Sequence, residues 1–346
     1  MNCFFSGGIT FHSAFGFKVG KSICHMSDKK KAELRNNLAD LKLVIIDEVS
    51  LVGADMLYRI HHRLCTLFHT NEMLPFANIN IMLVGDLLQL PPVRANHVFR
   101  EPKDDKLRAC HDGLEKPLWE EFQPMILRHN HRQGENKEWA ETLNRIREGI
   151  VTPEDEAILR ERVTSHKFLE EDALHTMYYN KVVNQHNKEM LTKLNYDLMA
   201  AKALHALPKG RKPFIKEGKG TIANSDFLDV FEFKIGARCM MIKNIDLIDD
   251  MFNGASGTIV GVEFDDKKQL KCIIVQFDDE AWGKNQRAKY PHYTKKYSNY
   301  NGTPIFRAEH EYNLSKGQWG HAARGKLLQF PLVLMYALTS HKMQVI

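Results

Sequence analysis

Two adjacent carboxylates, Asp47 and Glu48, directly follow the apolar run of residues 43–46. Four consecutive β-favouring residues predict a strand that is buried on both faces of a parallel sheet. The carboxyl ends of such strands are where ligands bind in open α/β sheets. In enzymes that hydrolyse nucleotides, one such acid orients magnesium and the other positions or deprotonates the attacking water. Alone the pattern is a weak indication, because many buried strands end in a solvated acid.

A second apolar run, residues 79–84, ends in Gly85 and Asp86, and Gln89 follows three residues later. The glycine permits a sharp exit from the sheet, and Pro91 and Pro92 stiffen the loop behind the polar residues. Apolar side chains between the two runs recur at helical spacing, and they are Leu57, Ile60, Leu64, Leu67 and Phe68. The pattern predicts a strand–helix–strand unit that brings Asp86 and Gln89 beside the first acid pair.

Arg132 lies in the polar segment 127–133 and is a candidate for an arginine that reaches a γ-phosphate. An arginine there stabilises the charge that develops on the transferred phosphoryl group. The structural alternative is an ion pair between domains, which such an exposed arginine also forms.

These segments together resemble the Pif-one (petite integration frequency) family of superfamily-one DNA helicases, whose motifs the RecD group and the helicase parts of Helitron transposons share. The matching segments follow the family's order along nearly the whole chain, and they are residues 7–15, 47–52, 85–93, 132–133, 179–187, 236–241, 253–258 and 336–344. The resemblance implies an α/β fold with two RecA-like motor domains, the first without its phosphate loop and the second incomplete, and a small SH3-like β-barrel insertion.

The expected domains are a partial first motor over 1–150, the start of the second over 151–228, the barrel over 229–315 and a return to the second motor over 316–346. Thr152 and Pro153 have the residue types of a helix N-cap and first turn. Residues 175–179 read as the first strand of the second motor, and the turn-rich pattern from 231 to about 312 favours short strands of a barrel. The basic stretch 207–220 is more often a solvated loop than a DNA contact.

The resemblance implies an ATP-dependent DNA helicase that moves 5′ to 3′ on single-stranded or forked DNA in repair, recombination and telomere maintenance. Asp47 is expected to hold Mg²⁺, Glu48 to activate water, Gln89 to sense the γ-phosphate and Arg132 to stabilise the transferred group. The catalytic residues are therefore Asp47, Glu48, Gln89 and Arg132, and the nucleotide-binding residues are Asp47, Asp86, Gln89 and Arg132.

Six polar residues in the first and last matching segments are the expected DNA contacts: Thr10, His12, Ser13, Thr339, His341 and Lys342. Two aromatic neighbours allow different readings. Phe15 is expected in the core, whereas Phe11 is either a core residue or a stacking platform, since stacking needs an exposed ring. The resemblance implies that the protein acts as a monomer.

The chain departs from the family at two places. The family has a glycine-rich phosphate loop ending in Lys-Ser/Thr before its Thr-x-His-Ser motif, because backbone N–H groups and the lysine hold the phosphates. Here residues 16–22 imitate that loop, but they have three residues instead of four between the glycines and they follow His12. After Gln344 the chain also lacks the family's glycine and arginine-bearing strand. We therefore expect this polypeptide to be inactive as an ATPase, and the alternative function is a catalytically dead DNA-binding remnant or a decayed Helitron helicase.

Composition agrees with these expectations without establishing them. The 346 residues are 43% hydrophobic, enough for real cores, and Lys plus Arg exceed Asp plus Glu by 48 to 43. The six cysteines are scattered, which favours reduced thiols. His61 and His62 are adjacent on the expected helix and face different directions, so they make a poor zinc pair. The sequence has no apolar run of membrane-spanning length, and the apolar run 331–338 is predicted to form one buried strand. The expected location is intracellular, in the nucleus or mitochondrion.

Overall fold

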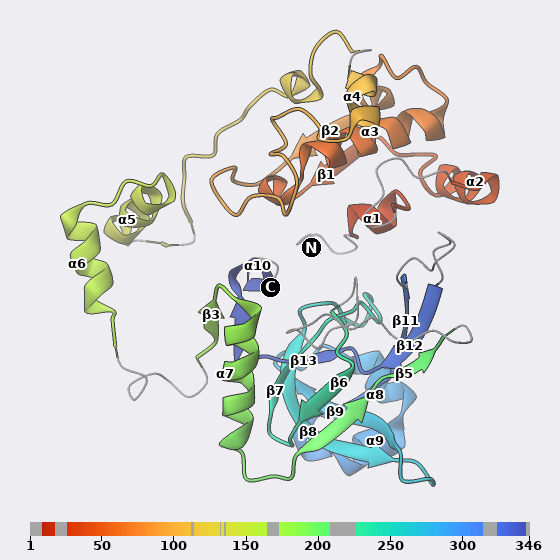
Figure 1. Ribbon diagram of the computed structural model, residues 1–346, viewed down its shortest axis with the longest axis vertical. Helices are drawn as coiled ribbons and strands as arrows, with labels where there is room; N and C mark the ends of the chain where they lie inside the picture. Colours follow the sequence, from red (N-terminus) through yellow and green to blue (C-terminus); the bar gives the residue numbers. More distant parts are fainter. Residues whose placement is uncertain are drawn as a thin grey trace, which may run out of the picture. The chain divides into compact units, whose positions relative to one another are not determined.

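The computed structural model describes residues 9–17, 26–111, 114–131, 133–134, 136–164, 173–207, 226–313 and 324–343. Arg132, most of the phosphate-loop imitation and nearly all of the basic stretch 207–220 lie outside the described residues. The chain forms two compact units, Met1–Ser165 and His166–Ile346 (Figure 1). In the part of the chain that the structure describes, no helix is long and apolar enough to cross a membrane.

The first unit is mainly helical around two parallel strands. Its helices are α1 (Phe11–Ala14), α2 (Asp28–Asn37), α3 (Ala54–Phe68), α4 (Asp105–His111), α5 (Lys137–Arg147) and α6 (Pro153–Glu161), and its strands are β1 (Leu43–Ile46) and β2 (Asn80–Leu83). β1 pairs with β2 in parallel register, from Leu43 opposite Asn80 to Ile46 opposite Leu83. The predicted strand–helix–strand unit is confirmed.

The core of this unit lies between α3 and one face of the two strands (Figure 1). Leu57, Ile60, Leu64 and Leu67 of α3 are fully buried, as their helical spacing predicts. The expectation that the strands are buried on both faces is wrong, because alternate side chains such as Leu43 (46% exposed) and Met82 (50% exposed) face solvent. Only two strands pair in the described sheet, and the core that includes α3 lies on one face of it, so the period-2 alternation of a half-covered sheet results.

His61 belongs to this core, and its neighbour His62 does not share its environment. The His61 ring is fully buried, and its Nδ1 accepts the Phe76 N–H at 3.0 Å. The His62 Nδ1 instead lies 2.6 Å from a carboxylate oxygen of Glu72. The two rings therefore face different directions, which agrees with the rejection of a shared zinc site.

Burial of the imidazole lowers the pKa of His61, and the nearby Glu72 only partly opposes this effect. The unfolded chain therefore binds a proton near its ordinary pKa of 6.5 while the folded chain does not. Neutral His61 therefore contributes its full share to the free energy of unfolding above pH 6.5. As the pH falls below 6.5 this contribution is lost, by at most about 1.4 kcal/mol per pH unit.

We expect His61→Gln to flatten the fall in unfolding free energy between about pH 7.5 and pH 5.5, because glutamine can accept the same N–H and does not titrate. Urea denaturation at several pH values measures this slope. His62→Gln is the matched control, since that ring is partly exposed. An identical pH slope in His61→Gln and the original protein would contradict the prediction.

The helical pair α5–α6 is held by a buried carboxylate. The Thr152 hydroxyl caps α6 by accepting the Asp155 N–H, and the Asp155 carboxylate accepts the Thr152 N–H. These two bonds confirm the predicted N-cap. Asp155 also accepts from Thr142 at 2.9 Å and from Arg145 at 2.6 Å on α5. These bonds hold the pKa of Asp155 far below its usual range, so the pairing of α5 with α6 persists at any physiological pH.

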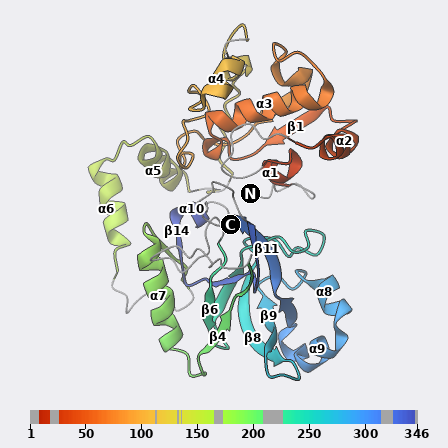
Figure 2. The same ribbon diagram turned by 45° about the vertical axis from the view of Figure 1, so that its right-hand side comes forward.

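The second unit consists mainly of short strands. Its strands are β3 (His175–Met177), β4 (Met199–Lys202), β5 (Leu204–Ala206), β6 (Val230–Phe233), β7 (Arg238–Met241), β8 (Ser256–Phe264), β9 (Leu270–Phe277), β10 (Thr303–Phe306), β11 (Ala308–Asn313), β12 (Arg324–Gln329), β13 (Leu332–Leu334) and β14 (Ala337–Thr339), and its helices are α7 (Asn180–Thr192), α8 (Lys284–Lys289), α9 (Pro291–Lys296) and α10 (Ser340–Met343). Antiparallel strands form a five-stranded sheet in the order β10-β9-β8-β7-β13, and β11-β12-β5 and β4-β6 form smaller sheets. Short parallel strands β14 and β3 pair beside α7 (Figure 2).

The prediction of short strands with turns from 231 to about 312 does not hold for residues 284–296, which form α8 and α9. Asp249, which is 4% exposed, accepts the N–H groups of Asn285 at 2.7 Å and Gln286 at 2.8 Å at the start of α8. Gly283 supplies the left-handed backbone before the helix. A cap that comes from a residue 36 positions away leaves no local signal, which is why the turn-rich pattern concealed this helix.

The run 331–338 is also not one strand, because the chain leaves one sheet and enters another inside it. β13 pairs with β7, and β14 pairs with β3. Asn187 of α7 bonds the backbone between them: its Oδ1 accepts the N–H groups of Tyr336 and Ala337, and its Nδ2 donates to the carbonyls of Leu334 and Ala337. A side chain thus replaces the strand ladder at this transfer point.

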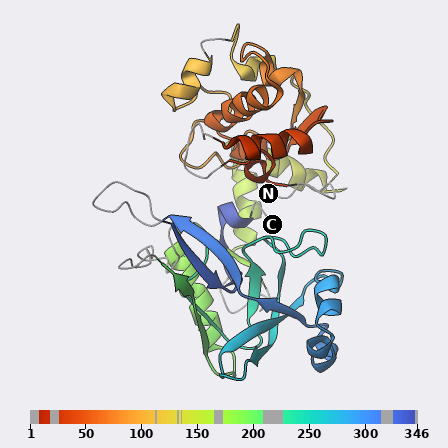
Figure 3. The ribbon, with the colours of Figure 1, turned by 90° about the vertical axis from the view of Figure 1, so that its right-hand side faces the viewer.

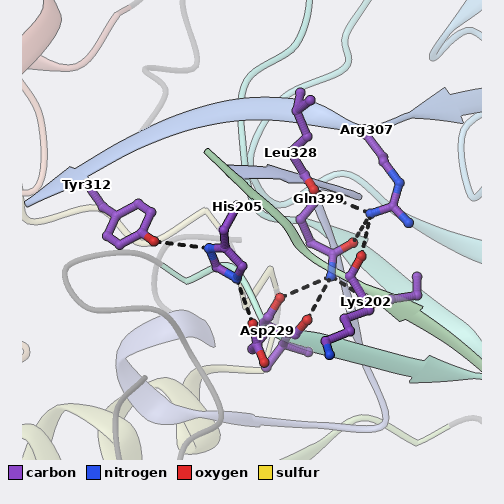
Figure 4. Close-up of polar contacts among 9 residues, drawn as sticks. Lys202, His205, Asp229, Arg307, Tyr312, Leu328 and Gln329 are labelled. Carbon is purple, nitrogen blue, oxygen red and sulfur yellow. Dashed lines mark hydrogen bonds and ion pairs between the residues drawn. The ribbon is translucent and has the colours of Figure 1, made fainter. Parts of the chain in front are cut away.

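A buried polar network joins the small sheets of the second unit (Figure 4). Gln329, fully buried, donates to a β4 carbonyl at 2.8 Å and accepts from Arg307 at 3.1 Å. The His205 ring of β5 lies 2.8 Å from an Asp229 carboxylate oxygen and 3.0 Å from the Tyr312 hydroxyl. Because each of these buried groups has a partner, the network fixes β4, β5, β11 and β12 relative to one another.

Candidate nucleotide and DNA site

The acid pair lies at the carboxyl end of β1, in a loop that is tied to the end of β2. The Val84 N–H donates to the Ile46 carbonyl at 2.8 Å, and the Val49 N–H donates to the Val84 carbonyl at 2.9 Å. Asp47 accepts the N–H of Glu48 at 2.8 Å through Oδ1. Glu48 itself has a left-handed backbone with φ of 53°, a conformation that non-glycine residues rarely adopt and that concentrates at functional sites.

Gly85 permits this close approach of the two strand ends. Its φ is +140°, and a Cβ placed on it would lie 2.8 Å from the Val49 nitrogen and 3.2 Å from the Glu48 Cα. Only a residue without a side chain fits between β2 and the acid-pair loop. The glycine that sequence patterning assigned to a sharp exit from the sheet therefore also sets the position of Glu48.

Gly85→Ala is expected to destabilise the first unit by about 1–3 kcal/mol, because the methyl group meets backbone atoms and the backbone conformation becomes strained. Urea denaturation measures the loss. Gly149→Ala separates the two causes, since Gly149 has φ of +78° but nothing within 4 Å of an added Cβ. If the two substitutions cost the same, the contact with the acid-pair loop contributes nothing.

Asp86 forms an ion pair that the sequence did not reveal. Its Oδ2 accepts from the Arg147 guanidinium at 2.7 Å, and its Oδ1 accepts the Leu88 N–H at 3.0 Å. Partial burial by itself would raise the pKa of Asp86, but these two donors hold it below its ordinary value. Arg147 lies 61 residues away on α5.

Gln89 follows in the same turn as Asp86. Its N–H donates to the Asp86 carbonyl at 3.0 Å, and its side chain is exposed. The structure thus brings Asp47, Glu48, Asp86 and Gln89 together at the ends of two adjacent parallel strands, as their spacing predicts. Their individual catalytic and binding roles remain predictions, and Arg132 lies outside the described residues.

Asp47 fits a magnesium ion as a single protein ligand. In nucleotide-hydrolysing sites Mg²⁺ is held by one or two carboxylates together with phosphate oxygens and water, so a dedicated cage is not required. The described residues contain no group of three or more His, Cys, Asp or Glu side chains that could hold a metal by themselves. The bond from the Glu48 N–H orients the Asp47 carboxylate, which is half-buried at the strand end.

The upstream DNA candidates lie on and next to α1. Thr10 caps this helix, and its hydroxyl oxygen accepts the Ser13 N–H at 3.3 Å. Ser13 is exposed, and His12 is half-buried. Burial, with the positive charge of Arg59 in support, lowers the pKa of His12. At neutral pH His12 therefore offers hydrogen bonds but no positive charge.

The aromatic residues of this segment pack toward the core. Phe15 is 3% exposed, which confirms its expected place in the core. Phe11 is partly buried against the same core, and its ring centroid lies 4.6 Å from that of His12. The structure therefore shows Phe11 as a partly buried packing residue.

The downstream DNA candidates lie in the second unit. Thr339 ends β14 and is only 9% exposed, whereas His341 on α10 is exposed. The Lys342 Nζ lies 3.9 Å from an Asp226 carboxylate oxygen, a loose and partly exposed ion pair. Of the three, His341 and Lys342 present polar groups to solvent, and Thr339 is better placed to hold the strand end.

Comparison with known proteins agrees with the motifs. The family model for the PIF1-like helicase matches residues 1–157. The ATP-dependent DNA helicase Pif1 of Campylobacter jejuni is 27% identical over 365 residues, which cover 99% of this chain and 72% of that protein. The ATP-dependent DNA helicase PIF1 of Emericella nidulans is 27% identical over 284 residues, and the match covers 80% of this chain and only 35% of that protein.

Solved structures extend the likeness to the fold. The crystal structure of Pif1 helicase from Candida albicans matches with a TM-score of 0.67 at 20% identity and covers 98% of this chain and 72% of that one. Pif1 helicase from Bacteroides in complex with ADP-AlF3 and ssDNA matches with a TM-score of 0.63 at 24% identity and covers 97% of this chain and 70% of that one. The chain has the mixed α/β fold of these structures, and its sequence resembles the Pif1 helicases along nearly its whole length.

Proposed function

We propose that the chain is part of an ATP-dependent DNA helicase that moves 5′ to 3′ and unwinds DNA during genome maintenance. The observation that carries the proposal is the juxtaposition of Asp47, Glu48, Asp86 and Gln89 at the ends of two parallel strands tied together by backbone hydrogen bonds. This is where an α/β motor binds its nucleotide. The relatives that match the chain are ATP-dependent DNA helicases.

Each carboxylate has a distinct role in the proposed mechanism. Asp47 holds Mg²⁺, which when bound neutralises phosphate charge. Glu48 positions the attacking water and takes its proton, and Gln89, exposed in the next loop, senses the γ-phosphate. Asp86, already paired with Arg147, holds the Gln89 turn and links it to α5. Arg132 is proposed to stabilise charge on the transferred group.

The proposed architecture is two RecA-like motors with an SH3-like barrel between segments of the second. The parallel pairing of β14 with β3 supports a return of the chain to the second motor, and the antiparallel β7–β10 region supports the insertion. Single-stranded or forked DNA is the proposed substrate, with Thr10, His12, Ser13, Thr339, His341 and Lys342 as the proposed contacts. We propose a monomer of the nucleus or mitochondrion, although one matching structure concerns two coordinating Pif1 helicases.

Strand-displacement assays on forks with a single 5′ or 3′ tail test this function in protein produced from the complete native transcript. Unwinding of the 5′-tailed fork that requires both ATP and Mg²⁺ is the expected result. Unwinding of only the 3′-tailed fork would contradict the direction, and ATP-independent strand separation would contradict the motor.

The second candidate is a non-catalytic DNA-binding remnant. The 346 residues contain no Gly-x-x-x-x-Gly-Lys-Ser/Thr segment, and the imitation at residues 16–22 has the wrong spacing. Without a lysine on the β- and γ-phosphates, this polypeptide by itself is expected to show no appreciable ATP hydrolysis. Reading both ends of the native transcript distinguishes the candidates, since an upstream phosphate loop and a downstream arginine-bearing strand favour the helicase.

A further inference from the structure

The segment that contains α8 and α9 has a local surplus of positive charge. Residues 284–302, which contain both helices, include four lysines and one arginine and no aspartate or glutamate. The whole chain has 48 cationic and 43 acidic residues, so the other residues hold 43 of each and sum to zero. A polyanion would therefore meet a local surplus of positive charge here, as it would at the basic stretch 207–220.

The insertion is anchored firmly enough to present that charge in a fixed arrangement. Tyr293 of α9 is 6% exposed and packs on Cys272 and Ile274 of β9. Tyr297 lies directly against Gly261 of β8, where an added Cβ would come within 2.2 Å of its ring. Figures 2 and 3 show both helices against the strands of the five-stranded sheet. The aromatic residues of the segment thus serve mainly as anchors.

The cations divide into those used internally and those that face solvent. Arg287 is 7% exposed and donates to the carbonyls of Trp282 and Glu280, so its charge serves the fold. The Lys296 Nζ pairs with a Glu263 carboxylate oxygen at 2.7 Å. The remaining three are Lys284, Lys289 and Lys295, which are exposed and form no ion pair within the described residues.

Other polar and aromatic side chains of residues 284–302 are also exposed. Asn285 and His292 lie between these lysines in the sequence, and Asn299 and Tyr300, the latter 49% exposed, follow Lys295. Lysine, asparagine and tyrosine are residues that contact phosphate oxygens, and an exposed ring can stack on a base. An acidic protein surface could also bind the lysines. The exposed aromatic rings and amides favour DNA, because they can also contact bases and phosphate oxygens.

We propose that the exposed side of α8–α9 is an accessory DNA-binding surface, in which Lys284, Lys289 and Lys295 contact the phosphodiester backbone. This proposal deepens the proposed function, on which it rests for the choice of DNA as the polyanion. It adds a contact separate from the six candidate residues of α1, β14 and α10. The surface lies on α8 and α9, so it increases the affinity for DNA without taking part in ATP hydrolysis.

The salt dependence of DNA binding tests the proposal in the 346-residue chain without nucleotide. Binding of a labelled single strand and of a duplex is measured by fluorescence anisotropy over a series of salt concentrations. Replacing all three lysines by glutamine is expected to reduce the slope of log K against log salt by about 2 for the single strand and by roughly 3 for the duplex. Replacing them by arginine is expected to retain the original slope.

The control replaces three other exposed lysines by glutamine: Lys181 and Lys188 on α7, and Lys193 directly after it. Equal slopes for the α8–α9 glutamine variant and the original chain, or equal losses in both glutamine variants, would overturn the proposal. Absence of salt-sensitive DNA binding in the original chain would overturn it as well. If the complete protein fails to hydrolyse ATP, that result contradicts the proposed roles of Asp47 and Glu48. It does not affect the salt dependence of DNA binding, which alone tests the α8–α9 surface.

Discussion

Glu48→Gln is expected to reduce DNA-stimulated ATP hydrolysis by about 10²- to 10⁴-fold in protein produced from the complete transcript, because a general base of this kind contributes that much. Glutamine preserves the size and shape of the side chain and cannot accept the proton of the attacking water. The loss should appear in kcat, while the KM for ATP changes little, because the residue acts on the water and not on nucleotide binding. Steady-state phosphate release measures both constants.

Glu33→Gln is a suitable control, since Glu33 is exposed on α2 and pairs with Lys30 on the same helix. Asp47→Asn provides a second comparison: it should raise the magnesium concentration needed for half-maximal activity, which Glu48→Gln should not. Hydrolysis by Glu48→Gln within a few-fold of the original rate would remove Glu48 from the mechanism and leave the acid pair as a structural feature of the strand end.

Much of this site could be predicted because its information is local. An apolar run followed by two acids places those acids at a strand end, and the helical spacing of Leu57, Ile60 and Leu64 fixes the connection to the next strand. Gly85 was identifiable as a turn residue from its position. Its contact with the Glu48 backbone was not, because that depends on how two loops meet in space.

The contacts that sequence patterning missed all join residues far apart in the chain. Arg147 reaches Asp86 across 61 positions, and Asp249 caps α8 across 36 positions. Neither arginine nor aspartate has a unique partner type, so charge alone cannot select these pairs. The same reason explains the error at 331–338. The apolar run predicts one strand, and the Asn187 side chain that bonds its backbone in the middle comes from a distant helix.

Burial was the other property that local patterning misjudged. A continuous apolar run such as 43–46 is typical of a strand covered on both sides, but cover depends on which elements pack on each face. In the described structure α3 packs on one side, and Leu43 and Ile45 remain 46% and 38% exposed on the other. The strand could be predicted from the sequence, but whether a second element covers its other face could not.

Asn187→Leu is expected to lower the free energy of unfolding of the second unit by about 3–5 kcal/mol, as large as single substitutions commonly reach. Asn187 is 6% exposed, and its side-chain amide makes four hydrogen bonds to backbone between β13 and β14, the shortest at 2.7 Å. Leucine has nearly the same size but would leave the Tyr336 and Ala337 N–H groups buried without these partners. Urea denaturation followed by circular dichroism measures the loss.

Two further variants separate hydrogen bonding from packing at this position. Asn187→Asp keeps the oxygen that accepts from Tyr336 and Ala337, but it cannot donate to the Leu334 and Ala337 carbonyls. It should therefore also destabilise, and protonation of the carboxylate at low pH should restore part of the loss. Gln185→Leu is the matched surface control on the same helix, where the side chain is exposed and its amide donates to Glu189. If Asn187→Leu is as stable as Gln185→Leu, the transfer of the chain between the two sheets does not depend on this amide, and the strand pairings alone must hold β14 in place.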